Sequence, residues 1–170
     1  MTSRRELLLT GVGTLIRTVL GSLPLLGWAQ RVEAASKAGD PRWALSEAEW
    51  KRRLSSQAYQ VLRQEATERP FSSPLNNEKR KGRFVCAGCR LPLFSSEAKF
   101  DSGTGWPSFW QPLPGAVATK TDFKLIVPRT EYHCQRCGGH QGHVFKDGPK
   151  PTGLRYCNNG VALLFEPAAG

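Results

Sequence analysis

The chain has 170 residues, the size of one ordinary domain with short additions rather than of two domains. Hydrophobic residues make up 39% of it and charged residues 22%, which excludes both a bundle of membrane helices and a disordered chain. The 17 glycines and 12 prolines favour a β-rich fold with many turns. The net charge of +10 is by itself no reason to expect nucleic acid, and we expect none.

Residues 1–35 have the three parts of a secretory signal: a charged start, an apolar middle and a small-residue end at Val32-Glu33-Ala34-Ala35-Ser36. The adjacent Arg4 and Arg5 resemble a twin-arginine signal, which exports folded proteins. Arg17 interrupts the apolar run and argues against a stable transmembrane helix. We expect export to the periplasm with cleavage. An uncleaved membrane anchor and a plain amphipathic helix are the alternatives.

A linker is expected over residues 36–45, and two short helices should follow it. Ser46-Glu47-Ala48-Glu49 is a capping box, and Ser55 or Ser56 is a second cap before another apolar-periodic stretch. The helices should end near Arg69-Pro70, because the residue before a proline disfavours helix. We expect these helices to pack and to carry no chemistry.

Beyond Pro70, short apolar runs alternate with turn residues, a pattern typical of an antiparallel all-β core. The expected strands are 82–85, 123–127, 130–132, 142–145, 154–156 and 161–165.

The cysteine count is odd, and four metal ligands plus one working thiol fit five cysteines better than disulfides do. Cys86-Ala87-Gly88-Cys89 and Cys134-Gln135-Arg136-Cys137 are two Cys-x-x-Cys knuckles. Each knuckle aims two thiolates from one tight turn at one ion, so the pair satisfies tetrahedral zinc. Two disulfides are the main alternative, and a thioredoxin-like pair or histidine ligands from positions 133, 140 and 143 are weaker ones.

Cys157 is the remaining cysteine. A buried cysteine that serves as a small hydrophobe is the simplest interpretation. Its neighbours favour a chemical role for the thiol, because Arg155 and Asn159 would lie on the same face of a strand as Cys157. A guanidinium and amide donors favour thiolate over thiol, which predicts a reactive group.

Two further stretches are candidates for a site. The stretch from Asp101 to Trp110 reads as a rigid loop that presents rings, with Trp106 as a binding wall, while Phe109 and Trp110 also suit the core. His140 and His143 could transfer protons near neutral pH.

Together these elements closely resemble the methionine-R-sulfoxide reductase (MsrB) family. The match runs from about Ser46 to Pro167, so we divide the chain into a catalytic domain over 46–167 and a tail over 168–170. The matching stretches are Glu68–Phe71, Cys86–Cys89, Lys99–Phe109, Arg129–Glu131, His140–Pro149 and Arg155–Asn159.

The resemblance implies two antiparallel sheets, one structural zinc on the four knuckle cysteines, no organic cofactor, and Cys157 as the nucleophile. It also implies that Trp106 holds the substrate methyl group, with Phe109 beside it. The resemblance assigns binding and protonation of the sulfoxide oxygen to His140, His143 and Asn159, and supporting polar roles to Asp147 and Arg155. Gln141 departs from the apolar residue often seen between the two histidines.

The activity implied is reduction of methionine-R-sulfoxide in oxidised proteins, through a sulfenic acid on Cys157. Many relatives carry a resolving cysteine where this chain has Thr104. We therefore expect that an external thioredoxin-like or glutaredoxin-like thiol reduces the sulfenic acid. We also expect the protein to be a monomer. A zinc-ribbon binding module and a zinc hydrolase are the competing functions, and the hydrolase would require an open metal position.

Overall fold

The computed structural model describes residues 40–123 and 127–169. The predicted signal or anchor over 1–35 and the first part of the predicted linker lie outside these residues. No helix in the described ranges has the length and apolar character needed to cross a membrane.

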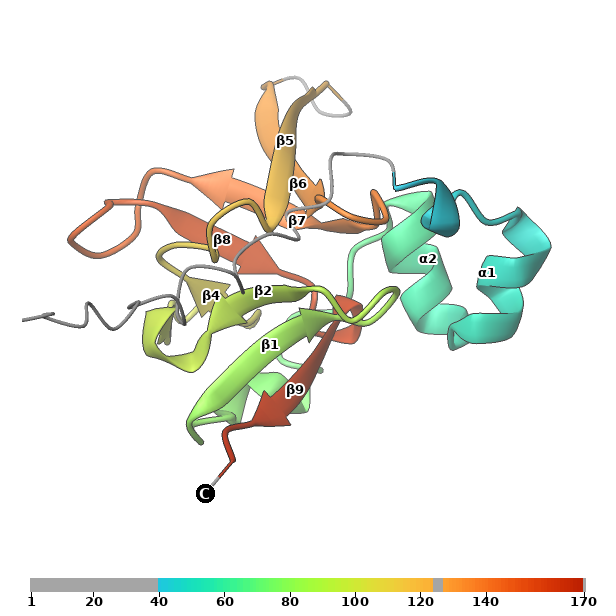
Figure 1. The fold of residues 1–170 in the computed structure, drawn as a ribbon. Coiled ribbons are helices and arrows are strands. Elements are labelled where there is room, and N and C mark those ends of the chain that lie inside the picture. The colour runs from blue at the N-terminus through green and yellow to red at the C-terminus, as the bar shows by residue number, and fades with distance from the viewer. Residues whose placement is uncertain (1–39, 124–126, 170) are drawn as a thin grey trace, which may run out of the picture. The chain divides into compact units, whose positions relative to one another are not determined.

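Two short α-helices open the described chain after a 3₁₀ turn, η1 (Pro41–Trp43). They are α1 (Glu47–Arg53) and α2 (Ser56–Gln64) (Figure 1). The capping box is confirmed, because the Ser46 hydroxyl accepts from the Glu49 amide and the Glu49 carboxylate accepts from the Ser46 amide at 2.8 Å. Helix α2 ends before the predicted Arg69-Pro70, because Glu65 takes a left-handed conformation with φ 54°.

Two antiparallel sheets form the rest, which confirms the predicted fold class. The first has the order β2-β1-β9 and the second the order β3-β4-β8-β7-β6-β5. The three strands of the first sheet are β1 (Gly82–Cys86), β2 (Pro92–Ser95) and β9 (Leu163–Pro167). The second contains β3 (Lys99–Phe100), β4 (Ser108–Phe109), β5 (Val117–Asp122), β6 (Arg129–Cys134), β7 (His140–Phe145) and β8 (Arg155–Asn158). Three further 3₁₀ turns are η2 (Pro74–Asn77), η3 (Ser96–Ala98) and η4 (Gly160–Ala162).

The predicted strand over 123–127 is the clearest local difference. Its described ends, Phe123 and Val127, are 74% and 71% exposed and lie outside the sheet, while its middle lies outside the described residues. The strand that pairs with β6 is instead β5, immediately before it. The sequence of β5 is polar, with threonine, lysine and aspartate, so its pattern does not indicate a strand. Polar residues are tolerated there because β5 is an edge strand with one solvated face.

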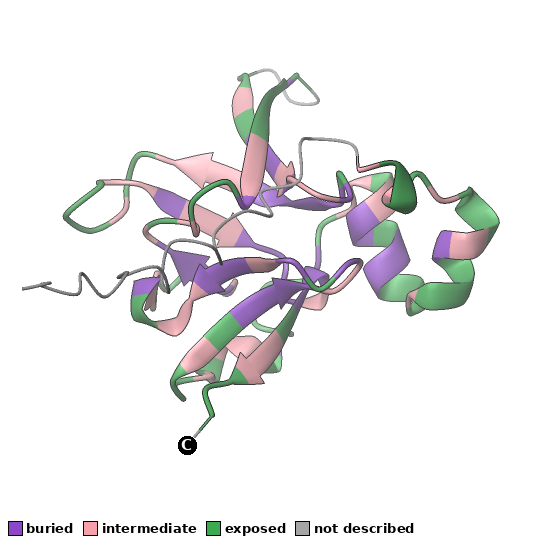
Figure 2. Cartoon of the chain, viewed as in Figure 1, coloured by how far each residue is buried: buried purple, intermediate pink, exposed green. Residues whose placement is uncertain are grey.

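Figure 2 shows buried positions on strands of both sheets. Aromatic side chains from these strands meet in one core. Phe109 of β4 stacks on Phe94 of β2 with ring centroids 4.2 Å apart, and its edge contacts Phe84 of β1. Tyr132 of β6 packs edge-on to Phe94. These contacts tie the six-stranded sheet to the three-stranded one and give the site a rigid support.

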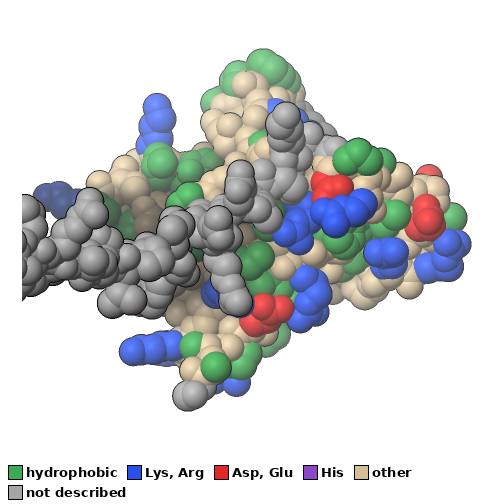
Figure 3. All heavy atoms as spheres, viewed as in Figure 1, with side chains coloured by type: hydrophobic (Ala, Val, Ile, Leu, Met, Phe, Trp, Pro, Cys, Tyr) green, Lys and Arg blue, Asp and Glu red, His purple; other side chains and the backbone are tan. Residues whose placement is uncertain are grey.

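Basic residues do not form one continuous field on the face shown in Figure 3, where Lys and Arg lie in separate groups among apolar and acidic side chains. Several are paired, as in Arg90–Glu166 at 2.7 Å and Arg80–Glu78 at 2.6 Å. Exposed ion pairs of this kind add little to the free energy of folding, so these basic side chains are not what stabilises the fold.

Candidate active site and four-cysteine centre

The register of the six-stranded sheet places Cys157 in a row of side chains that runs across the strands. Glu131 of β6 lies opposite His143 of β7, His143 lies opposite Cys157 of β8, and Cys157 lies opposite Ser108 of β4. Facing residues in antiparallel strands have Cβ atoms about 4.5–5.5 Å apart. His143 and Cys157 are therefore neighbours because of strand pairing, although they lie far apart in sequence.

A cavity of about 120 Å³ opens beside this row. The predicted residues Trp106, His143, Cys157 and Asn159 all border it. The remaining lining residues are Thr67, Arg129, Gly142, Phe145 and Asn158. The cavity thus joins one thiol, one imidazole and one amide to an indole ring, in a space suited to a single small side chain.

Burial raises the pKa of the Cys157 thiol above its ordinary value, and this outweighs the Arg155 charge and hydrogen bonds from Thr104 and Arg155, which favour the thiolate. The sequence predicted that Arg155 and Asn159 would favour the thiolate. Arg155 acts in this direction, Thr104 rather than Asn159 supplies a hydrogen bond, and desolvation outweighs both. In the free protein the sulfur therefore holds its proton at neutral pH. The reaction has to remove that proton locally.

Arg155 and Asp147 lie behind the thiol rather than at the cavity. The guanidinium binds the Asp147 carboxylate through two hydrogen bonds of 2.9 and 2.8 Å, and it also lies over the Phe145 ring at 4.3 Å. This pairing raises the pKa of Arg155 and lowers that of Asp147. Both residues are thus placed to act on Cys157 electrostatically, and neither borders the cavity.

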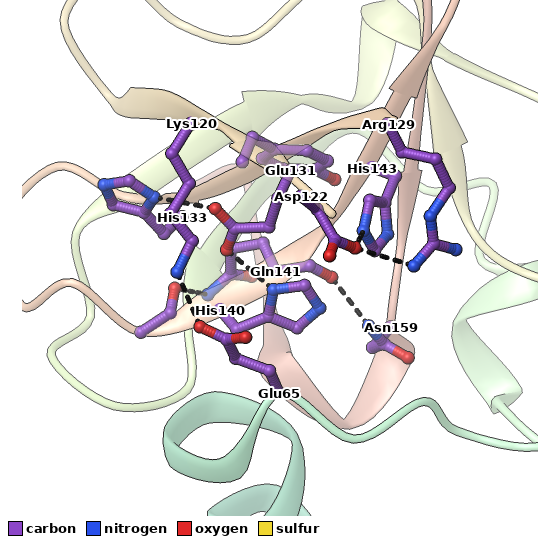
Figure 4. A network of polar contacts seen from close by, with 12 residues as sticks. Glu65, Lys120, Asp122, Arg129, Glu131, His133, His140, Gln141, His143 and Asn159 are labelled. Atoms are coloured by element: carbon purple, nitrogen blue, oxygen red, sulfur yellow. Dashed lines mark hydrogen bonds and ion pairs between the residues drawn. The ribbon is translucent and has the colours of Figure 1, made fainter. Parts of the chain in front are cut away.

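His143 is held by a carboxylate that the sequence analysis did not single out. Its Nε2 lies 2.7 Å from Asp122 Oδ2, and the Arg129 guanidinium binds the same oxygen at 2.7 Å (Figure 4). Burial lowers the pKa of His143, although the Asp122 hydrogen bond opposes this. The imidazole is therefore neutral at pH 7.

A second carboxylate, Glu131, bridges two other histidines. Its two oxygens contact His140 Nδ1 at 2.7 Å and His133 Nδ1 at 3.1 Å (Figure 4). Burial raises the pKa of Glu131, but the hydrogen bonds from His133 and His140 dominate and lower it to about 2. His140 is buried and does not border the cavity, and its ring centroid lies 5.5 Å from that of His143.

Glu68 connects three parts of the cavity wall, another role that sequence patterns did not reveal. Its backbone amide donates to Asn159 Oδ1 at 2.9 Å, and its carbonyl accepts from Trp106 Nε1 at 2.9 Å. Its buried carboxylate accepts from the Val161 amide at 2.8 Å and from the Ser72 hydroxyl at 3.0 Å. Glu68 therefore holds both the Trp106 indole and the Asn159 amide, two groups that border the cavity.

Phe109 has a different position from the one expected of a substrate-binding residue. It is fully buried, stacks on Phe94 and does not border the cavity. The reason is strand alternation, because Ser108 faces Cys157 while Phe109 points to the opposite face of β4. We therefore treat Phe109 as a core residue.

Hydroxyl groups lie on the other side of Cys157. Ser102 Oγ is 2.8 Å from both Thr104 Oγ1 and Ser108 Oγ, which forms a short chain of hydroxyls. Thr104 thus contacts both this chain of hydroxyls and the Cys157 thiol.

The four knuckle cysteines form one buried cluster, with all their sulfur atoms within 4.8 Å of one another. Cys86 Sγ lies 3.7 Å from Cys137 Sγ, and Cys89 Sγ lies 3.5 Å from Cys134 Sγ. Four sulfurs at about 2.3 Å from a tetrahedral zinc are about 3.8 Å apart, so the donor set and its spacing fit that ion. All four are free cysteines, so the structure does not contain the alternative disulfides.

The two knuckles have the same local geometry. In the first, the Arg90 amide donates to the Cys86 carbonyl at 2.8 Å, and Arg90 is left-handed with φ 59°. In the second, the Gly138 amide donates to the Cys134 carbonyl at 2.9 Å, with φ 67° at Gly138. Each turn thus brings its two thiols to one side. The three histidines do not join this cluster, because each of them binds a carboxylate.

A zinc-type cluster that clips a two-sheet β domain, with a separate cavity around a single thiol, defines a small class of thiol-dependent proteins. The family model of the SelR domain matches residues 54–167. The chain is 51% identical over 128 residues to a peptide methionine sulfoxide reductase MsrB of Agrobacterium fabrum, covering 75% of this chain and 95% of the relative. A protein of the same name from Bradyrhizobium diazoefficiens is 52% identical over 136 residues, covering 79% and 98%. The chain belongs to the MsrB family of peptide methionine sulfoxide reductases.

Proposed function

We propose that the chain reduces the R epimer of methionine sulfoxide in oxidised proteins, with Cys157 as the nucleophile. The observation that carries the proposal is the cavity itself, where the Cys157 thiol, the Trp106 indole and the His143 imidazole border one space of about 120 Å³. Membership of the MsrB family supports the reaction class. The result is repair of oxidised proteins, since methionine is restored without breaking the chain.

Trp106 is the proposed wall for the substrate methyl group. Its Nε1 is bonded to the Glu68 carbonyl, so the ring is fixed at one edge and offers an apolar face. The polar groups His143 and Asn159 border the same cavity. A sulfoxide whose methyl group meets the indole would turn its oxygen toward these polar groups in only one of its two epimers.

His143 is the proposed acceptor of the thiol proton. A neutral imidazole that donates from Nε2 to Asp122 presents Nδ1 as an acceptor, and Cys157 is its cross-strand neighbour. The proton then passes to the sulfoxide oxygen. His140, buried behind His143 and bonded to Glu131, supports this transfer from outside the cavity.

The chemical step transfers one oxygen atom. The Cys157 sulfur forms a bond to the sulfoxide oxygen, the S–O bond of the substrate breaks, and its electron pair stays on the methionine sulfur. The thiol proton ends on the transferred oxygen. Cys157 is oxidised to a sulfenic acid, and methionine is reduced and released.

An external thiol restores Cys157 in this proposal. The first thiol attacks the sulfenic acid and water leaves, and a second thiol then attacks the mixed disulfide and releases Cys157. The loop residue that contacts the Cys157 thiol is Thr104, which cannot form a disulfide. The other four cysteines lie together in the cluster. Intact-mass analysis after turnover without reductant tests this, since an internal disulfide to Cys157 would contradict it.

We also propose that the cluster holds one structural zinc ion. Four buried cysteine sulfurs complete its coordination, and the bound ion cross-links the knuckle after β1 to the knuckle after β6. A cluster closed in this way leaves no position for a metal-bound water. This favours the reductase over the competing zinc hydrolase.

The test is reduction of the two methionine sulfoxide epimers driven by dithiothreitol, with wild type compared to Cys157→Ser. We expect the wild type to consume the R epimer, and Cys157→Ser to lose at least a thousandfold in rate while still holding zinc. Absence of turnover by zinc-loaded wild type would contradict the proposed activity and favour the competing function of a zinc-ribbon binding module. Full activity in Cys157→Ser would place the chemistry on another residue.

Export is a separate proposal, supported by Arg4-Arg5 and the signal-like pattern of residues 1–35. The twin-arginine route moves folded proteins, so the metal could be loaded before export. Cell fractionation of wild type and of an Arg4→Lys, Arg5→Lys double variant tests the route, because unchanged export would refute it.

A further inference from the structure

Gln141 is a fully buried amide that lies between the four-cysteine cluster and the cavity. It belongs to β7, directly after His140, at the point where the register with β6 shifts by one residue and the regular alternation of side chains is interrupted. Its side chain contacts Cys86 and Asn158 rather than His143 and Cys157. A buried amide is costly unless its donors and its acceptor are all paired, so its contacts indicate what it does.

The donor end of the side chain faces the cluster. Gln141 Nε2 lies 3.5 Å from Cys86 Sγ and 3.4 Å from the Gly139 carbonyl, which follows the second knuckle. An N–H that points at a cysteine sulfur is best satisfied when that sulfur is a thiolate. Such contacts to a metal ligand orient it and tune the metal. This contact also crosses from the six-stranded sheet to the three-stranded one, because Cys86 ends β1.

The acceptor end faces the cavity. Gln141 Oε1 accepts from Asn158 Nδ2 at 3.4 Å. The backbone carbonyl of Gln141 accepts from the backbone amide of Asn159 at 2.8 Å and from its side chain at 2.9 Å, and Figure 4 shows Gln141 beside Asn159. Asn158 and Asn159 both border the cavity. The Asn158 side chain also accepts from the Tyr132 hydroxyl at 2.6 Å.

We propose that Gln141 is a positioning residue that couples the four-cysteine metal centre to Asn158 and Asn159. A metal-bound Cys86 thiolate orients the Gln141 amide, and the amide in turn fixes Asn158 at the cavity. By linkage, metal binding and substrate binding then favour each other. The inference rests on the proposed zinc site and on the proposed role of Asn159.

The test compares Gln141→Met with wild type, because methionine has a similar volume but cannot donate to Cys86. The first readout is zinc release to a chromophoric chelator, which requires no turnover. We expect release about tenfold faster in Gln141→Met. Gln141→Glu should release zinc faster still, because a carboxylate repels the thiolates. Gln57→Met, at an exposed position of α2, is the matched control and should release zinc like wild type.

A spectroscopic readout separates coupling from simple packing. In protein loaded with NMR-active cadmium, the Gln141 side-chain amide proton should show scalar coupling to the metal through the Cys86 sulfur. The Asn158 side-chain signals should shift in Gln141→Met and remain unshifted in Gln57→Met. With metal bound, the KM for methionine-R-sulfoxide should rise a few-fold in Gln141→Met.

Equal zinc release in Gln141→Met and wild type, or absence of the cadmium coupling, would overturn the inference. Loss of turnover in wild type would instead refute the proposed function and leave both metal readouts interpretable.

Discussion

The five cysteines lie in two regions whose surroundings differ: four thiols are buried together in a cluster, and one lies at the cavity. In the cluster, four sulfurs lie within 4.8 Å of one another, all buried, and each knuckle turn is closed by a backbone hydrogen bond. At the cavity, Cys157 stands alone among the described cysteines, half-buried and facing open space. The cluster surrounds each sulfur with the other three, whereas the cavity leaves the Cys157 sulfur accessible from one side.

The difference teaches that surroundings, and not residue type, assign the roles. The cluster sulfurs sit in tight turns whose geometry is local, so each Cys-x-x-Cys unit brings its own two thiols to one side. The fold then brings the two units together, with Cys86 beside Cys137 and Cys89 beside Cys134. Cys157 owes its neighbours to strand register, which places His143 on one side and Ser108 on the other. One region should therefore govern stability, and the other should govern turnover.

The largest contrast is expected between Cys134→Ser and Cys157→Ser. Removing one of four metal ligands should lower the free energy of unfolding by more than about 4 kcal/mol, since loss of a metal is among the most damaging changes. Cys157→Ser should lower it by less than about 1 kcal/mol, because a similar side chain stays at a half-buried position. Denaturant unfolding of both proteins, each prepared in the presence of zinc, measures this. Similar losses in the two variants would show that the regions are not separable.

Glu131 should make the cavity side sensitive to acid. Its folded pKa of about 2 lies below the ordinary 4.5, so its ionised form stabilises the fold. The stabilisation is complete above pH 4.5, amounts to about 3 kcal/mol, and is lost as the pH falls toward 2. Glu131→Gln should be less stable by that amount at pH 7, and the gap should close at low pH.

Denaturant titrations of both proteins at several pH values test this prediction, with the exposed Glu47→Gln as the control. A stability gap between Glu131→Gln and wild type that stays constant from pH 7 to pH 2.5 would show that the carboxylate does not act through its charge.

The two regions also differ in how far the sequence predicts them. The knuckles and the Ser46 capping box are readable because each depends on residues a few positions apart. Asp122 and Glu131 were missed as partners of the histidines, because only lateral strand pairing brings them together. The Phe123–Val127 run reads as a strand, yet its described ends are solvent-exposed, since an apolar pattern does not reveal which segment finds a partner strand. For Phe109 the sequence left a core role and a binding role open, because the face to which its side chain points depends on the register with β8.

Glu68→Ala should disturb the cavity without touching the cluster. The change leaves the Val161 amide without its acceptor, at a cost of about 1–3 kcal/mol, while the Ser72 hydroxyl keeps the Arg69 carbonyl as an acceptor. The backbone that holds Trp106 and Asn159 then loosens, so KM should rise more than kcat falls. Steady-state kinetics and zinc release measure the two effects, with the exposed Glu97→Ala as the control. Faster zinc release in Glu68→Ala would mean that the disturbance reaches the cluster.

The smallest expected effect concerns the reactivity of Cys157 itself. Burial raises its pKa, and the Arg155 charge opposes this while the Asp147 charge adds to it. Arg155→Met should therefore raise the pKa further and slow alkylation by iodoacetamide at neutral pH by about tenfold. Asp147→Asn should act in the opposite direction and more weakly. The four cluster cysteines are buried, so mass spectrometry can follow the alkylation of Cys157 separately across a pH series. Equal pH profiles for wild type and Arg155→Met would mean that desolvation alone sets the thiol pKa, and that Arg155 serves the fold rather than the nucleophile.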